Sequence, residues 1–140
     1  MNQVNLSFSA SLDNVNFSRS VIVGFLININ PDINFINELK TVVSEAVTNS
    51  IIHGYNEDSS MLVYMNIKYD LEYVYLEIID YGIGIEDVSK AKEPLFSTKL
   101  EEERAGLGFT IMEVFTDEMI VESKVNEGTK LYFKKRYKEN

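Results

Sequence analysis

The stretch PDINFINELKTVVSEAVTNSIIHG, residues 31 to 54, limits the possible folds more than any other part of the chain. Its apolar residues recur at the spacing of one helix face, which comprises Ile36, Leu39, Val42, Val43, Ala46 and Val47. Glu45, Asn49 and His53 are four residues apart and form a stripe beside that face. A carboxylate, a carboxamide and an imidazole at the margin of a buried face need polar partners. The pattern predicts one long, packed helix with chemistry along one edge.

Local signals predict both ends of this helix. Asn30 can serve as the N-cap, and Pro31 can occupy the first helical position, where a missing N–H costs nothing. Gly54 can adopt the left-handed conformation that often ends a helix. Because Ile51 and Ile52 fall outside the apolar arc, we expect the last turn to be buried on more than one side.

The remaining elements follow from alternating and helical periodicities. Strands are expected at residues 2–9, 61–69, 72–79, 117–125 and 129–137, and further helices from Ser11 or Asp13 to about Ile27 and from Leu107 to about Phe115. Residues 80–85 should form a Gly-rich turn, and residues 86–104 a charged loop or short helix. Hairpins with helices on one face predict an α+β fold, a two-layer sandwich with a mixed, mostly antiparallel sheet. We expect a single domain over residues 1–140.

Composition excludes several classes of site. The chain has no cysteine, which rules out disulfides, thiol nucleophiles and cysteine-ligated zinc. The apolar run from Val21 to Ile27 is too short to span a bilayer, and the N-terminal residues lack the pattern of a signal peptide. We therefore expect a cytoplasmic protein.

The net charge of −9, from 13 basic and 22 acidic residues, argues against sequence-independent binding of nucleic acid. An acidic protein that binds a polyphosphate needs a bridging cation or a locally basic loop. The cluster KKRYK near the C-terminus is basic, but a solvated strand end is the favoured interpretation.

Each glycine motif is weak on its own. Asp80-x-Gly82-x-Gly84 is more typical of a tight turn than of a ligand site. Gly106-x-Gly108 before a helix either exposes backbone N–H groups to a phosphate or simply makes a loop. A GxxxxGK[ST] phosphate loop is absent from the sequence.

In combination the motifs are much more specific. They occur in a fixed order: Glu45 and Asn49 on a long helix, Asp80-x-Gly82-x-Gly84 after a strand, a charged segment, Gly106-Leu107-Gly108 before a helix, and Gly128-Thr129 at the start of a strand. This order resembles the GHKL ATP-binding fold of histidine kinases and gyrase-type ATPases. Within that fold, SEAVTNSIIHGY, EPLFSTK and GLGFTIME resemble the anti-sigma factor/serine-protein kinase family, most closely its sporulation branch.

The resemblance implies a role for each motif residue. The residue matching Asn49 coordinates magnesium, so triphosphate oxygens and water would supply the other ligands. The residue matching Glu45 is the general base. The residue matching Asp80 accepts a hydrogen bond from the exocyclic amine of adenine, and an unpaired carboxylate there would reject the carbonyl of guanine.

Other nucleotide contacts follow from the same resemblance. They are Gly82, Gly84 and Thr129 near the base, Gly106, Leu107 and Gly108 at the phosphates, and Lys99 and Arg104 in the charged lid. The two lid cations would approach the terminal phosphate, and Arg104 would take part in the transfer. His53 is the only histidine, so metal ligation by it is disfavoured and a structural role at the helix end is expected.

As a function, the resemblance implies an ATP- and magnesium-dependent serine-protein kinase that is also an anti-sigma factor. It would inhibit sporulation sigma factor F, phosphorylate a serine of its anti-anti-sigma partner, and form a homodimer. The expected partner surface is the N-terminal strand and first helix with Arg19, although a solubilising charge explains Arg19 equally well. Two alternatives remain: an anti-sigma kinase of a stress or other sigma pathway, and a binding module with a structural nucleotide and no phosphoryl transfer.

Overall fold

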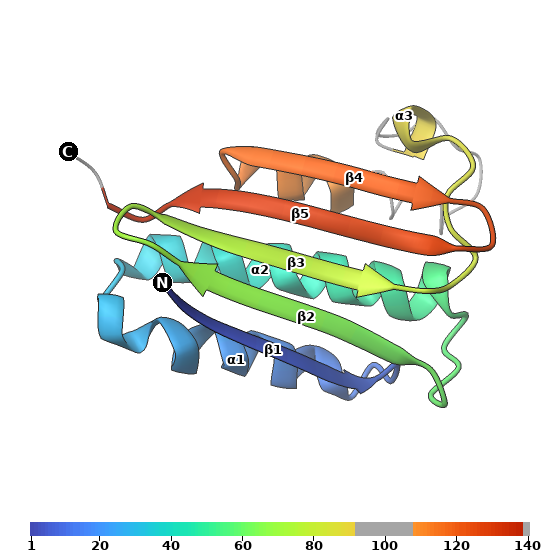
Figure 1. Ribbon diagram of the computed structural model, residues 1–140, viewed down its shortest axis with the longest axis horizontal. Coiled ribbons are helices and arrows are strands. Elements are labelled where there is room, and N and C mark those ends of the chain that lie inside the picture. Colours follow the sequence, from blue (N-terminus) through green and yellow to red (C-terminus); the bar gives the residue numbers. More distant parts are fainter. Residues whose placement is uncertain (92–107, 139–140) are drawn as a thin grey trace.

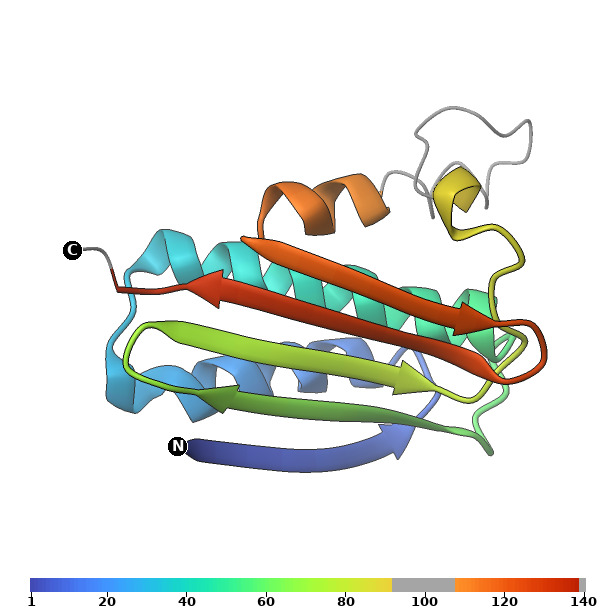
Figure 2. The same cartoon turned by 45° about the horizontal axis from the view of Figure 1, so that its top comes forward.

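The computed structural model describes residues 1–91 and 108–138. Its strands are β1 (Asn2–Ser9), β2 (Leu62–Tyr69), β3 (Tyr73–Asp80), β4 (Glu118–Lys124) and β5 (Gly128–Arg136). Its helices are α1 (Asn14–Leu26), η1 (Ile27–Ile29), α2 (Ile33–Asn49), η2 (Ser50–Gly54), α3 (Val88–Ala91) and a helical segment at 108–114. Figures 1 and 2 show α1, α2 and the segment 108–114 on the same face of the sheet.

The five strands form one sheet in the order β1-β2-β3-β5-β4. All four pairings between these described strands are antiparallel, so the parallel component of the predicted sheet is not found there. The pairing of β3 with β5 places Asp80 opposite Thr129. The predicted α+β, two-layer sandwich is confirmed, and its register brings two candidate site residues together at one end of the sheet.

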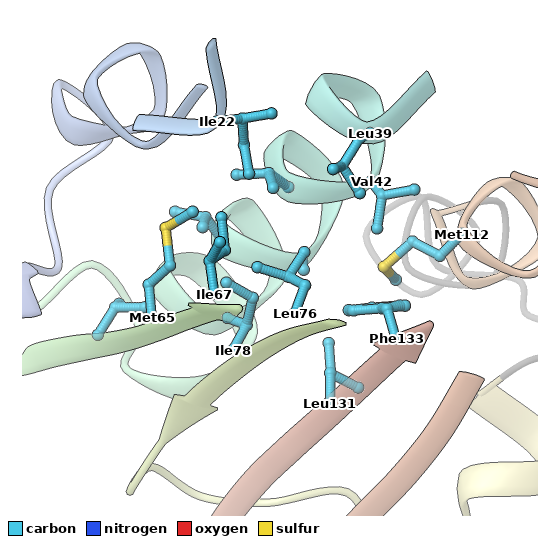
Figure 3. Close-up of a cluster of buried hydrophobic side chains, with 14 of the residues drawn as sticks. Ile22, Leu39, Val42, Met65, Ile67, Leu76, Ile78, Met112, Leu131 and Phe133 are labelled. Carbon is cyan, nitrogen blue, oxygen red and sulfur yellow. The ribbon is translucent and has the colours of Figure 1, made fainter. Parts of the chain in front are cut away.

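The core lies between the sheet and the helices. Figure 3 shows its central side chains: Met65, Ile67, Leu76, Ile78, Leu131 and Phe133 from the strands, and Ile22, Leu39, Val42 and Met112 from the helices. Each alternates along its strand or recurs along its helix, as the periodicity predicts. Full burial of such a side chain stabilises the fold by roughly 1.5–3 kcal/mol, which holds the helices on this face.

The start of α2 differs from the prediction. Asp32 is the N-cap, and its carboxylate accepts a hydrogen bond of 2.8 Å from the backbone N–H of Phe35. Asn30 instead adopts a left-handed conformation with φ of 46° and closes the preceding turn η1. The prediction of Asn30 as N-cap and Pro31 as first helical residue is therefore wrong, because a carboxylate two residues later satisfies the free N–H groups.

The end of α2 also differs, because the helix continues into a π-turn, η2. The N–H of Tyr55 donates to the carbonyl of Ser50 at 3.0 Å, the five-residue spacing of a π-turn. Gly54 ends this turn, but among the described glycines only Gly84 and Gly128 have positive φ. The predicted left-handed conformation of Gly54 is therefore wrong, and its reason for being glycine lies in a contact described below.

Candidate functional site

Asp80, the last residue of β3, is a carboxylate that is only 3% exposed. Its Oδ1 accepts the N–H of Gly82 at 3.0 Å. Burial raises the pKa of the Asp80 carboxyl, and hydrogen bonds from Gly82, Ser50 and Thr129 offset part of that rise. A buried carboxylate can accept further hydrogen bonds from a ligand that carries an amine.

Gly54 of η2 lies directly against this carboxylate, which Ser50 of the same turn also contacts. A Cβ built on Gly54 would lie 2.8 Å from Oδ1 of Asp80, so any side chain here would displace the carboxylate. In a regular α-helix the stripe of Glu45 and Asn49 would continue to His53. The edge that meets Asp80 is offset by one residue from that stripe, because it carries Ser50 and Gly54, which are also four residues apart. Glu45 and Asn49 lie together against Gly108, as the stripe predicts, while the place of His53 on that stripe stays a prediction; His53 makes an interaction of its own.

Close backbone packing explains the two glycines of the loop after Asp80. A Cβ on Gly82 would lie 2.0 Å from the carbonyl oxygen of Gly54, and one on Gly84 would lie 2.1 Å from that of Lys124. Gly84 also has φ of 75°, a conformation that favours glycine. These contacts account for both glycines without a ligand, while their approach to a base stays a prediction.

Thr129 belongs to a hydroxyl network that joins the loop to the β4–β5 hairpin. Its Oγ1 lies 2.8 Å from Oγ of Ser123. The same Ser123 oxygen accepts the N–H of Ile85 at 2.7 Å and lies 3.2 Å from the carbonyl of Gly128. The network fixes the position of the Thr129 hydroxyl next to Asp80.

A second group of predicted residues lies at the C-terminal end of α2, around Glu45 and Asn49. A Cβ built on Gly108 would lie 2.9 Å from Oε2 of Glu45 and 3.5 Å from Nδ2 of Asn49. The first described residue of the segment 108–114 is therefore held directly against the edge of α2. Burial raises the pKa of the Glu45 carboxyl above its ordinary value, which suits a base working closer to neutral pH.

Asn49 carries a buried polar atom that needs a partner. Its Nδ2 has no hydrogen-bond partner within the described parts of the chain, which is costly for a buried amide. Since the oxygen and nitrogen of a carboxamide exchange by a half-turn, the same position can present Oδ1, a suitable ligand for magnesium. Residues 1–91 and 108–138 hold no cluster of three or more His, Cys, Asp or Glu for a metal. The unpaired carboxamide of Asn49 fits a metal that takes its other ligands from a nucleotide and water.

We expect Asn49→Ala to weaken ADP binding about tenfold or more when magnesium is present, a change of at least ~1.4 kcal/mol. Metal-free ADP binding should change little, because the carboxamide acts through the metal. Calorimetric titrations with and without magnesium check this. Equal losses under both conditions would show that Asn49 is a structural residue.

The predicted site residues fall into two groups joined by one helix edge. Asp80, Gly82, Gly84 and Thr129 gather at the end of β3 and the start of β5, while Glu45, Asn49 and Gly108 gather on α2. Ser50, which follows Asn49 directly, contacts Asp80 and links the two groups. Lys99, Arg104, Gly106 and Leu107 lie outside the described residues.

Sequence reasoning missed three residues of this site. Ser50 and Ser123 contact Asp80 and Thr129, and Tyr55 hydrogen-bonds the backbone beside Asp80. A serine or tyrosine next to a predicted helix or strand carries no signal of its own. Their roles emerge only from the π-turn and from the pairing of the strands.

Comparison with known proteins identifies the family. Residues 8–135 match the family model described as a histidine kinase-like ATPase domain. An anti-sigma F factor of Geobacillus stearothermophilus is 49% identical over 136 residues, which cover 97% of this chain and 93% of the relative. This chain belongs to the anti-sigma F factor family. A second member of this family, from Priestia megaterium, is 51% identical over 135 residues, covering 96% of this chain and 92% of the relative.

A solved structure supports the fold of this anti-sigma F factor family member. The crystal structure of the RsbU and RsbW domains of a Mycobacterium tuberculosis protein superposes with a TM-score of 0.72 at 17% identity. The match covers 100% of this chain and 34% of that longer chain, so it shows the fold alone. Within the described residues, none of the helices has the length and apolar character needed to cross a membrane. The predicted family and the predicted ATPase fold are confirmed.

Proposed function

We propose that the chain is an anti-sigma factor that binds and inhibits sigma factor F and that phosphorylates a serine of its anti-anti-sigma partner from ATP. One observation carries this proposal. The end of α2 and the turn η2 place Glu45 and Asn49 against Gly108, and Ser50 and Gly54 against the buried Asp80 of β3. A base, a metal ligand and an amine-accepting carboxylate would thus lie along the same side of the helix. The family membership supports the choice of an adenine nucleotide as the ligand.

In this proposal each described residue has a defined task. Asp80 accepts a hydrogen bond from the exocyclic amine of adenine, and the Thr129 hydroxyl joins that network. Asn49 contributes its carboxamide oxygen to magnesium, which when bound neutralises charge on the phosphates. By the family resemblance, the turn at residues 106–108 holds the phosphates, and Lys99 and Arg104 approach the terminal one.

Glu45 is the proposed general base. It accepts the proton of the serine hydroxyl as that oxygen attacks the terminal phosphorus and ADP leaves. Burial raises the pKa of its carboxyl, which makes the deprotonated Glu45 a stronger base than an ordinary surface glutamate. The closeness of Gly108 to Oε2 keeps this carboxylate at the phosphate end of the site.

The proposal includes a cytoplasmic homodimer that uses β1 and α1. β1 pairs only with β2 among the described strands, so its outer edge is open. On α1, Phe17 is 48% exposed and Val23 42% exposed, in the same helix as Arg19. Sedimentation showing a monomer at all protein concentrations would contradict the dimer.

Transfer of labelled phosphate tests the proposed function. Purified protein, γ-labelled ATP, magnesium and the anti-anti-sigma protein should give a labelled phosphoserine on the partner, and sigma factor F should bind in the presence of nucleotide. Nucleotide binding without any transfer would favour the module with a structural nucleotide. Binding of a stress sigma factor in place of sigma factor F would favour the other pathway.

A further inference from the structure

The hydroxyl of Tyr55 bridges two backbone groups at the base end of the site. It accepts the N–H of Tyr81 at 2.7 Å and donates to the carbonyl of Leu62 at 2.7 Å. The Tyr55 side chain is buried, and burial raises its pKa, so the hydroxyl keeps its proton and can donate. Both bonds have near-ideal length and leave the hydroxyl in one defined position.

Gly54 and Tyr55, at the end of the π-turn and directly after it, contact the end of β3 and the following loop at three residues. Gly54 lies against the carboxylate of Asp80. Tyr55 accepts the N–H of Tyr81, and the carbonyl of Gly54 accepts the N–H of Ile83 at 3.0 Å. Asp80 is therefore held from its side chain by Gly54 and from its following peptide by Tyr55.

The π-turn η2 leads directly into Tyr55, which is its C-cap. Ser50 and Gly54 of this turn contact Asp80, and the next side chain, that of Tyr55, reaches the Tyr81 N–H. Single π-turns inside helices are frequent at functional sites.

We propose that Tyr55 is a positioning residue for base selection, which acts through the Tyr81 N–H to hold Asp80 where it receives an adenine amine. The inference rests on the proposed nucleotide site. The Asp80 carbonyl lies on the other side of the same peptide, and a Cβ on Gly128 would come within 2.1 Å of it. Rotation of this peptide would therefore move Asp80 relative to both Gly128 and Gly54. The Tyr55 hydroxyl is the contact that opposes such a rotation from the α2 side.

The test compares ADP with inosine diphosphate, in which a carbonyl replaces the exocyclic amine. Calorimetry should show that the wild-type protein prefers ADP. Tyr55→Phe removes the hydroxyl and keeps the ring, so ADP affinity should fall about tenfold while inosine diphosphate affinity changes little. The preference for adenine, expressed as the ratio of the two affinities, should fall by the same factor. A purely structural role would leave that ratio unchanged in the folded protein.

Tyr137→Phe is the matched control. The Tyr137 hydroxyl also donates to a backbone carbonyl, that of Asp70, but at the opposite end of β3 from Asp80. This variant should lose stability without losing the preference for ADP. An unchanged ratio in Tyr55→Phe, or the same loss of ratio in Tyr137→Phe, would overturn the inference.

Amide hydrogen exchange of the wild-type protein keeps the proposal testable even if Tyr55→Phe does not fold. The Tyr81 N–H should be protected in the nucleotide-free protein, and exchange at the rate of an unprotected amide would overturn the inference. The proposed function fails differently: a wild-type protein that binds both diphosphates equally would remove adenine recognition by Asp80. A wild-type preference that survives in folded Tyr55→Phe would overturn only the role of Tyr55.

Discussion

Asp80→Ala is expected to lower ADP and ATP affinity by about two orders of magnitude or more while the protein stays folded. The carboxylate is buried and accepts the Gly82 N–H, so its removal takes away the proposed acceptor for the adenine amine and one hydrogen bond to the loop that follows. Isothermal titration calorimetry measures the affinities, and circular dichroism checks the fold. Unchanged affinity in a folded Asp80→Ala protein would rule out adenine recognition by this residue.

Asp80→Asn offers an independent check on the environment of the carboxylate without any ligand. Because burial raises the folded-state pKa of Asp80, the ionised form costs stability as pH rises from the ordinary aspartate value through the raised one. The neutral amide has no such dependence. The stability of Asp80→Asn relative to wild type should therefore increase with pH over that window, and denaturant unfolding at several pH values measures it.

Glu45→Gln is expected to lower serine phosphorylation by about two to four orders of magnitude while nucleotide binding survives. The substitution keeps the shape of the side chain beside Gly108 but removes the base. Binding of sigma factor F should also remain, because that binding needs the nucleotide-bound shape and not the transfer. Single-turnover phosphorylation with saturating ATP separates the chemical step from binding.

The pH profile of phosphorylation by the wild-type protein provides the control for Glu45. Phosphorylation should rise with pH as Glu45 loses its proton, and the raised pKa places this rise above that of an ordinary glutamate. In Glu45→Gln this rise with pH should disappear together with most of the phosphorylation rate. A Glu45→Gln protein that phosphorylates at the normal rate, or that keeps the same dependence on pH, would exclude Glu45 as the base.

The periodicity of apolar residues predicted the main helices and strands. These elements are defined by which side chains they bury, and the spacing of apolar residues shows this directly. The buried face of α2 and the alternation of β3 follow from it. The cap of α2 was mispredicted because Asn30, Pro31 and Asp32 are all acceptable near a helix start, and the choice depends on which side chain reaches a free N–H.

From the sequence, the candidate site could be predicted only at residues whose side-chain type itself indicates a chemical role. Glu45, Asn49 and Asp80 each carry a charge or a carboxamide, and they occur in an order that indicates a function. The structure places Glu45 and Asn49 on one edge of α2 and Asp80 against the turn that follows. The π-turn leaves no mark on the sequence, because one added residue is decided by the contacts of Gly54 and Tyr55 with the loop after β3. The contacts of Ser50, Gly54 and Tyr55 with Asp80 and Tyr81 were therefore out of reach.

Calorimetric titration of the wild-type protein with ADP and GDP, with and without magnesium, tests the central claim most directly. The account predicts saturable ADP binding that magnesium strengthens through Asn49 and that is about 100-fold tighter than GDP binding, since Asp80 accepts from an amine and rejects a carbonyl. Equal affinity for the two nucleotides, or no binding of ADP, would contradict it.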